Sequence, residues 1–408
     1  MCAAVDCSSG RVAGSSAEGA SAAQAAPIVR AEPAAQPQPL KVLVTTPRYL
    51  PQIGGVETHV YEVSRRLARM GLDLTIATTD LTGRLRPREE VDGVKIRRVR
   101  AWPSDRDYYF APGIRAAIAD GPWDLVHCQG YHTLVTPIAM LSALQRGIPY
   151  AVTFHSGGNS SHVRNALRGL QRAALRPLLS RASALIGVSR FEADFFSRRL
   201  RIPRNRFVVI ANGSDLPASP APTEDSTDET LILSIGRLER YKGHQRILDA
   251  LPLIRRHIAN ARLRIVGSGP YEQQLRRRAR QLGMDKYVEI RPVPAADRSA
   301  MASLLSRASL VTLLSDYEAH PIAIVEALSL SRPVLVSDTS GLREFGETGQ
   351  ARMISVRALP SQIAYAALKQ LESPITAPAV AVPTWDECAA AVLRVYQSIV
   401  DGMRPCES

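Results

Sequence analysis

The feature that most constrains the fold of this chain is a series of short apolar segments, separated by longer amphipathic ones, that occurs twice. In the first half, the apolar segments are 41–46, 74–78, 94–99, 125–128, 150–154, 184–188 and 207–210. In the second half, they are 231–235, 263–266, 287–290, 310–314, 334–337 and 353–356. This alternation is typical of parallel sheets that helices cover on both faces. The sequence therefore predicts an α/β protein with two Rossmann-like, doubly wound domains that face a central cleft.

Residues 215–230 interrupt the alternation with prolines, acidic residues and Ser/Thr, a composition typical of a linker. We expect an N-terminal domain at 40–214 and a C-terminal domain at 231–384, each large enough to bury its own core. Residues 1–39 are rich in Ala, Ser, Gln and Pro, which predicts a disordered tail or reflects a misassigned start codon. Residues 385–408 follow the second domain and begin with a helical stretch.

The chain carries a formal net charge of +13. Such an excess suggests an anionic partner, which could be a lipid surface, a nucleic acid or a phosphorylated substrate. Aromatic residues make up only 5% of the chain, which disfavours a stacking platform for single-stranded nucleic acid.

Five cysteines are scattered along the chain without metal-site spacing, which indicates reduced thiols. No apolar run is long enough to span a bilayer, and the first residues lack the pattern of a secretory signal. We therefore expect a cytoplasmic protein, with a peripheral contact at the inner face of the cell membrane as a further option.

Two carboxylates, Glu318 and Glu326, bracket a segment that is otherwise apolar apart from His320. Pro321 fits the first position of a helix, which places Glu318 on the preceding loop and Glu326 on the second helical turn. The free amides of Ile322 and Ala323 would then form an anion site at the positive end of the helix dipole. This pattern favours a site for phosphate and sugar, although a capped helix with two solvated glutamates would have the same sequence.

Two cations follow the apolar segment 231–235. Arg237 and Lys242 lie in the stretch Arg-Leu-Glu-Arg-Tyr-Lys-Gly, just beyond the predicted strand. Open α/β sheets bind ligands at the carboxyl ends of their strands. Together the two side chains could neutralise a diphosphate without a metal, whereas either one alone would more often be a solvated loop cation.

The first half contributes two further candidates at strand ends. Gly54 and Gly55 lie between a predicted strand and a helix, where they would let the backbone approach a phosphate or an acceptor and would tolerate positive φ. An ordinary turn is the alternative. His155 follows the segment 150–154, where its ring could donate a hydrogen bond to a sugar hydroxyl or could simply be satisfied by neighbouring residues.

Together these blocks resemble the retaining glycosyltransferases of family 4, which have the two-domain GT-B fold. The four segments that carry the resemblance are Gly54-Gly55-Val56-Glu57, Phe154-His155-Ser156-Gly157-Gly158, the block 236–243 and the pair Glu318 and Glu326. Weaker matches are Val188-Ser189, Ile210-Ala211-Asn212-Gly213 and Val266-Gly267-Ser268-Gly269-Pro270. The resemblance covers about 40–400 and departs from the family at Ala211, where proline is common, and at Ser331, where glycine is common.

The resemblance implies transfer of a hexosyl unit from a UDP- or GDP-hexose to a glycan, a lipid-linked or a small-molecule acceptor, with retention of configuration. It assigns catalytic roles to His155 and Glu318, whose backbone carbonyl and carboxylate, respectively, would face the reacting sugar. Arg237, Lys242 and the helix start at Ile322 would stabilise the leaving diphosphate, and Glu326 would hold the ribose. The remaining donor-binding residues are Gly54, Gly55, His320 and Ala323. No Asp-x-Asp motif lies where a metal would be needed, so we expect no cofactor and no metal. The resemblance also implies that the final helix crosses back onto the first domain.

Three alternative functions remain open. A nucleotide-sugar epimerase or an inverting transferase would use the same fold, but an epimerase needs further acid–base residues in the first domain. A basic nucleic-acid-binding protein would account for the net charge but not for the 236–243 and Glu318–Glu326 blocks, so we expect no nucleic acid as a partner.

A stripe of arginines lies just after the His155 loop. Arg164, Arg168, Arg172 and Arg176 recur every four residues, which stacks them along one face of a helix that Pro177 would end or kink. Leucines alongside the stripe supply apolar partners. The stripe suggests docking on an anionic membrane, although a solvated face of a core-packing helix would look the same.

Overall fold

The computed structural model of the protein describes residues 39–402, except for 53, 104–109, 157–161, 218–228, 295–296 and 376–381, and gives no side chains for 162–167. The predicted disordered tail therefore lies outside the described residues, apart from Pro39, and most of the predicted linker does too. Cys2, Cys7 and Cys406 also lie outside them. The described cysteines, Cys128 and Cys388, are free thiols in the core.

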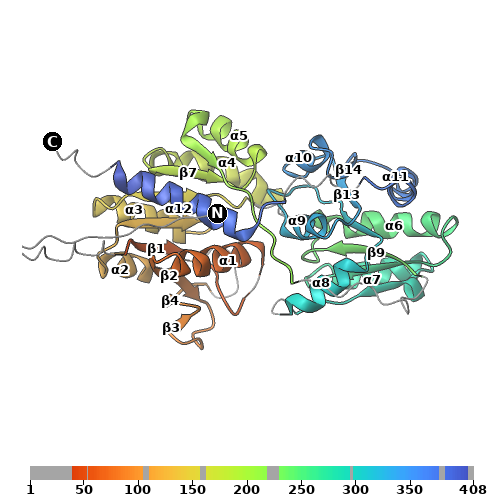
Figure 1. The fold of residues 1–408 in the computed structure, drawn as a ribbon, viewed down its shortest axis with the longest axis horizontal. Helices are drawn as coiled ribbons and strands as arrows, with labels where there is room; N and C mark the ends of the chain where they lie inside the picture. Colours follow the sequence, from red (N-terminus) through yellow and green to blue (C-terminus); the bar gives the residue numbers. More distant parts are fainter. Residues whose placement is uncertain are drawn as a thin grey trace, which may run out of the picture. The chain divides into compact units, whose positions relative to one another are not determined.

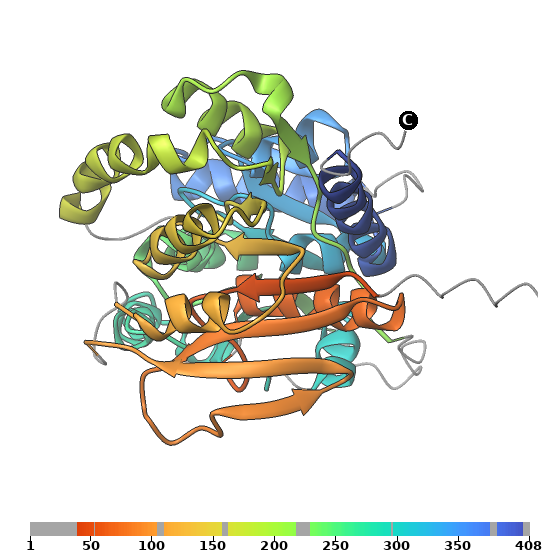
Figure 2. The same ribbon diagram turned by 90° about the vertical axis from the view of Figure 1, so that its left-hand side faces the viewer.

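The first half of the chain forms an eight-stranded sheet with the order β3-β4-β2-β1-β5-β6-β7-β8. Its strands are β1 (Lys41–Thr45), β2 (Asp73–Asp80), β3 (Arg88–Val91), β4 (Val94–Arg100), β5 (Leu125–Gln129), β6 (Tyr150–Thr153), β7 (Ala184–Gly187) and β8 (Phe207–Val209). All neighbouring pairs are parallel except β3 and β4, which form an antiparallel hairpin at the edge of the sheet, visible in orange in Figure 2. The sequence did not predict β3, because its residues Arg-Glu-Glu-Val lack the apolar character of the other strands.

Helices connect these strands and cover both faces of the sheet, as Figure 1 shows. They are α1 (Gly55–Arg69), α2 (Gly113–Ala119), α3 (Val135–Gln145), α4 (His162–Leu179) and α5 (Arg190–Leu200). One buried cluster lies on the face with α2, α3 and α5 and includes Tyr131, Phe154 and Phe196. A second cluster lies on the face with α1.

The second half forms a six-stranded parallel sheet with the order β11-β10-β9-β12-β13-β14. Its strands are β9 (Thr230–Ile235), β10 (Ala261–Val266), β11 (Val288–Ile290), β12 (Leu310–Leu313), β13 (Val334–Ser337) and β14 (Arg352–Ile354). Its helices are α6 (His244–Arg255), α7 (Glu272–Gln281), α8 (Arg298–Ser306), α9 (Ile322–Ser329), α10 (Leu342–Glu347) and α11 (Pro360–Glu372). Separate buried clusters lie on its two faces. The predicted fold class, with two doubly wound α/β domains, is confirmed.

The last helix, α12 (Trp385–Asp401), packs on the first domain rather than on the second, where it lies beside α1 (Figure 1). Trp385, Val392 and Tyr396 are buried in the same cluster as Val60 and Leu67 of α1. A capping box begins the helix, because Thr384 Oγ1 accepts from the Glu387 amide at 3.1 Å and Glu387 accepts from the Thr384 amide at 2.8 Å.

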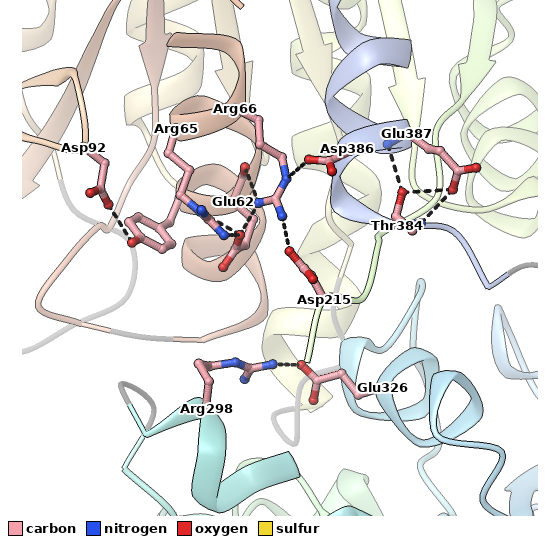
Figure 3. A network of polar contacts seen from close by, with 11 residues as sticks. Glu62, Arg65, Arg66, Asp92, Asp215, Arg298, Glu326, Thr384, Asp386 and Glu387 are labelled. Carbon is pink, nitrogen blue, oxygen red and sulfur yellow. Dashed lines mark hydrogen bonds and ion pairs between the residues drawn. The ribbon is translucent and has the colours of Figure 1, made fainter. Parts of the chain in front are cut away.

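A buried arginine fastens this crossing helix, as Figure 3 shows. Arg66 of α1 is 4% exposed. It donates to Asp386 at the start of α12, with 2.5 Å between Nε and Oδ1, and pairs with Glu62 and with Asp215 at the end of the first domain. Three segments distant in sequence therefore share one guanidinium, whose five donors suit such a network.

Candidate active site

The site is built around an ion pair between the loops that follow β9 and β12. Lys242 Nζ lies 2.7 Å from Glu318 Oε1, and Ser315 Oγ donates to the same carboxylate oxygen at 2.7 Å. These strands are neighbours in the second sheet, so their carboxyl ends bring the two loops together. Burial alone would lower the pKa of Lys242, but the Glu318 carboxylate reverses this effect and raises it, so the amine stays charged.

Two glycines, one after β9 and one after β13, allow the backbone to approach the β12 loop closely. Gly243 has φ of 75°, and a Cβ there would lie 1.8 Å from the Leu314 carbonyl oxygen. At Gly341 a Cβ would lie 1.7 Å from the Ala319 carbonyl oxygen. The Glu318 amide in turn donates to Ser340 Oγ at 2.9 Å. The position of Glu318 is therefore fixed by both its side chain and its backbone.

Arg237 is held mainly through its backbone. His244 Nε2 lies 3.1 Å from the Arg237 carbonyl oxygen, and the next residue, Leu238, donates its amide to the Ser268 carbonyl at 2.9 Å. Backbone hydrogen bonds to the segment 266–270 thus hold the Arg237 loop in place, which gives this weak sequence match a structural role. The guanidinium contacts Glu239 at 2.8 Å and Tyr241 at 3.0 Å, while 59% of the side chain stays exposed and available to a ligand.

Helix α9 begins at Ile322, and Pro321 is its N-cap, with ψ of 120°. The prediction that Pro321 is the first helical residue is thus wrong by one position. Glu326 lies on the second turn, as expected, is 4% exposed, and accepts a hydrogen bond from Arg298 of α8 (Figure 3). Burial raises the pKa of Glu326, and Arg298 opposes the rise. No sequence pattern identifies Arg298, because it lies 28 residues from its partner.

The His320 ring lies against Phe345, with 5.3 Å between the ring centroids. It lines a pocket of about 200 Å³ with apolar residues that include Val325 and Leu328. Burial lowers the pKa of His320 to about 4, so the ring is neutral. Its carbonyl accepts from Asn212 Nδ2 at 2.7 Å, and Asn212 also contacts His59 Nδ1 at 2.9 Å. The backbone of His320 is thereby linked to helix α1.

Gly54 and Gly55 lie at the start of α1, as predicted, and the positive φ that glycine tolerates is not used there. Gly54 is extended, with φ of −157°, and Gly55 opens the helix, so neither uses positive φ. A Cβ on Gly54 would lie 2.6 Å from Glu57 Oε2, whereas a Cβ on Gly55 would meet nothing within 4 Å. Gly54 thus makes room for the Glu57 carboxylate. Burial raises the pKa of Glu57, and Arg48 and Arg237 oppose part of this rise.

His155 follows β6 and adopts φ of 46°, a left-handed conformation that is uncommon for a residue with a side chain. It is 9% exposed, and its Nε2 lies 2.7 Å from Gln129 Oε1. Burial, together with His59, His127 and His132, holds the pKa of His155 well below its usual value. The His155 ring, predicted to donate a hydrogen bond to a sugar hydroxyl, is therefore already hydrogen-bonded to Gln129. No motif in the sequence identifies Gln129.

The residue after His155 connects the two halves of the chain. Ser156 donates its amide and its hydroxyl to Glu192 at 2.6 and 2.5 Å, and its hydroxyl lies 2.7 Å from the Tyr317 hydroxyl. Glu192 also accepts from the Val188 amide, and burial raises its pKa. The spacing Ser189-x-x-Glu192 is a helix-capping signature that could have identified this carboxylate. The other motif glycines, Gly157 and Gly158, lie outside the described residues.

The arginine stripe lies on α4, which continues through Pro177 to Leu179, so of the two predicted effects of Pro177, an end or a kink, the end is wrong. Arg172 lies over the Phe195 ring at 5.7 Å and Arg168 is half-buried, whereas Arg176 is exposed. Leu175 and Leu179 are in the core. The Arg164 side chain lies outside the described part of the chain. Helix α4 is thus a core-packing helix whose described arginines differ in exposure.

Within the described residues, no group of three or more His, Cys, Asp or Glu side chains is arranged to hold a metal ion. Among the same residues, no helix is both long and apolar enough to cross a bilayer.

Two family models match the chain in tandem. The model of glycosyltransferase family 4 matches residues 53–217, and that of the glycosyl transferases group 1 matches residues 217–380. Two curated relatives are a GDP-mannose:cellobiosyl-diphosphopolyprenol alpha-mannosyltransferase of Komagataeibacter xylinus and a glycogen synthase of Mycobacterium tuberculosis. The first is 25% identical and the alignment covers 90% of this chain and 95% of the relative. The second is 27% identical, with 90% and 96% covered.

Solved structures with the same fold include sucrose-phosphate synthase of Thermosynechococcus elongatus, with a TM-score of 0.71 at 18% identity over 89% of this chain and all of that one. Another is Anabaena HepE in complex with UDP-glucose, with a TM-score of 0.67 at 17% identity over 89% and 99% of the two chains. The tandem family matches, the two parallel-sheet domains and these neighbours agree, and the chain belongs to glycosyltransferase family 4, with the GT-B fold.

Proposed function

We propose that this glycosyltransferase moves a hexosyl unit from a nucleoside-diphosphate sugar to an acceptor hydroxyl, with retention of configuration and without a divalent metal. The observation that carries the proposal is the ion pair between Lys242 and Glu318 at the ends of two neighbouring strands. It puts a cation for a leaving diphosphate beside a carboxylate for the sugar.

Departure of the diphosphate places negative charge on its oxygens and positive charge on the sugar ring. The negative charge on the diphosphate would be stabilised by Lys242, by Arg237 and by the free amides at the start of α9. Glu318 offsets the cationic ring and accepts hydrogen bonds from sugar hydroxyls. Glu326 is oriented by Arg298 and keeps its second carboxylate oxygen for the ribose hydroxyls.

Retention follows if the acceptor attacks on the face from which the diphosphate leaves. The bond between the anomeric carbon and the phosphate oxygen breaks, and a bond from that carbon to the acceptor oxygen forms. The proton of the acceptor hydroxyl passes to the departing phosphate. The resemblance directs the His155 carbonyl toward the anomeric carbon, and the left-handed backbone at His155 is of the uncommon kind that clusters at functional sites.

The relatives suggest the class of substrates. Among them are a GDP-mannose-dependent mannosyltransferase with a diphosphopolyprenol acceptor and D-inositol 3-phosphate glycosyltransferases, and a structural neighbour binds UDP-glucose. We infer a UDP- or GDP-hexose donor and an acceptor in polysaccharide, glycolipid or related glycoconjugate synthesis. A lipid-linked acceptor would also give the arginines of α4 a role in peripheral contact with an anionic membrane.

The donor is tested by thermal shift with a panel of UDP-, GDP- and ADP-hexoses in buffer with EDTA. A donor at a hundred times its Kd stabilises the folded protein by about 2.7 kcal/mol. One nucleotide sugar should raise the melting temperature in EDTA, and Lys242→Ala should remove most of that rise. Arg278→Ala, on helix α7, removes an ion pair with Asp249 outside the site; it is the control and should keep the rise. A shift that appears only after Mg²⁺ or Mn²⁺ is added would contradict the metal-independent site.

A further inference from the structure

The hydrogen bond between Gln129 and His155 has a defined donor and a defined acceptor. Gln129 is the last residue of β5, and it pairs with Thr153 at the end of the neighbouring strand β6. His155 follows two residues after Thr153. The carboxyl ends of two parallel strands thus bring the amide side chain, 3% exposed, to the imidazole at 2.7 Å.

The Gln129 amide lies between two histidine rings, His155 and His127. Its Nε2 lies 3.3 and 3.4 Å from the two ring nitrogens of His127. Those ring nitrogens are themselves engaged, Nδ1 with the Tyr396 hydroxyl of α12 at 2.6 Å and Nε2 with Thr153 Oγ1 at 2.8 Å. The structure places the amide nitrogen toward the His127 ring and the amide oxygen toward His155.

An amide oxygen only accepts hydrogen bonds, so Nε2 of His155 must carry the proton in this contact. Burial keeps the His155 ring neutral, and the titratable groups that face it, His59, His127 and His132, act in the same direction. A neutral imidazole with a proton on Nε2 has a lone pair on Nδ1. Nδ1 makes no hydrogen bond to the described residues, so the ring can offer an acceptor to a ligand.

We propose that Gln129 is a positioning residue that fixes the Nε2–H tautomer of His155, so that Nδ1 accepts a hydrogen bond from a hydroxyl of the donor sugar. The proposal rests on the proposed function for the identity of the ligand. It reverses the polarity expected from the sequence, in which the ring donates to the sugar. The tautomer itself is a property of the free protein and can be measured without any substrate.

The direct test is ¹⁵N NMR of the imidazoles in the full chain at neutral pH, with the His155 signals identified by their loss in His155→Gln. The expected result is a protonated Nε2 and an unprotonated Nδ1. Protonation on Nδ1 alone, or on both nitrogens, would overturn the proposal whatever the enzyme transfers. Absence of transferase activity, with the expected tautomer present, would instead count against the proposed function.

Gln129→Met removes the acceptor at nearly constant volume and should give a mixture of His155 tautomers with a fall in kcat/KM of about tenfold. Gln171→Met is the matched control, because Gln171 binds the Tyr131 carbonyl on the same domain. It should leave both the tautomer and kcat/KM unchanged. A single unchanged tautomer in Gln129→Met would overturn the proposal.

Gln129→Glu serves if the methionine variant does not fold. The carboxylate keeps the acceptor but raises the pKa of His155, so Nδ1 becomes protonated, and the acceptor is lost, at a higher pH than in the wild type. Activity should therefore fall as the pH is lowered, beginning at a higher pH than in the wild type. A pH profile identical to that of the wild type would overturn the proposal, because a purely structural glutamine would not move it.

Discussion

At the residue scale, the site depends on charges that the fold keeps in fixed states. Glu318 accepts from Lys242 and from Ser315, and its loop is packed so closely that Gly341 has no room for a side chain. A carboxylate held by two donors needs little reorganisation when positive charge develops beside it, which is the condition for strong electrostatic catalysis.

Buried histidines set the behaviour of the molecule in acid. Burial lowers the pKa of His59, His244 and His320 to about 4 and that of His127 to about 3. The unfolded chain takes up protons near pH 6.5 but the folded chain does not, so stability is full above that pH and is lost as the pH falls toward 4. We expect the melting temperature to decrease steadily from pH 6.5 to 4.5 in scanning calorimetry. A constant melting temperature over this range would show that these rings are not buried in the neutral form.

At the scale of elements, the sequence predicted the strands that are apolar and missed what depends on contacts between distant elements. The central strands β1, β5, β9 and β12 read as apolar runs because helices cover both faces of each sheet. The polar edge strand β3 has no such signal. Gln129 and Arg298 were missed for another reason, since each acts on a partner that only the strand order or the helix packing brings within reach.

The docking of α12 on α1 depends on the buried Arg66. Removing this guanidinium leaves Glu62, Asp215 and Asp386 without their shared cation, and Asp215 and Asp386 are largely exposed, so water compensates them in part. We expect Arg66→Leu to lower the free energy of unfolding by about 2 kcal/mol and to speed hydrogen exchange in α12. The control is Arg69→Leu, on the exposed last turn of α1. Equal protection of α12 in both variants would contradict this role for Arg66.

At the scale of the whole molecule, the net charge of +13 accords with anionic ligands and with the proposed membrane contact. Because Arg172 already lies over Phe195, the contact is best tested with Arg164, Arg168 and Arg176 changed to Gln and Arg172 left in place. Each arginine near an anionic surface contributes about 1 kcal/mol, so this variant should lose most of its binding to anionic vesicles in co-sedimentation. The control changes the exposed Arg277, Arg280 and Lys286 of the second domain and should bind as the wild type does. Equal recovery of wild type on neutral and anionic vesicles would exclude the contact.

The central claim is that Glu318 and its partner Lys242 form the reacting centre of a nucleotide-sugar transferase. The most direct measurement is the rate of nucleoside-diphosphate release, with the donor that the thermal-shift panel identifies, from wild type, Glu318→Ala and the control Asp316→Asn. Asp316 lies two residues away and pairs with Arg246 at 2.6 Å, with half of its side chain exposed. We expect Glu318→Ala to lower the rate by about 10²-fold or more without loss of fold, and Asp316→Asn to keep it. Near-normal release by a folded Glu318→Ala protein would contradict the account.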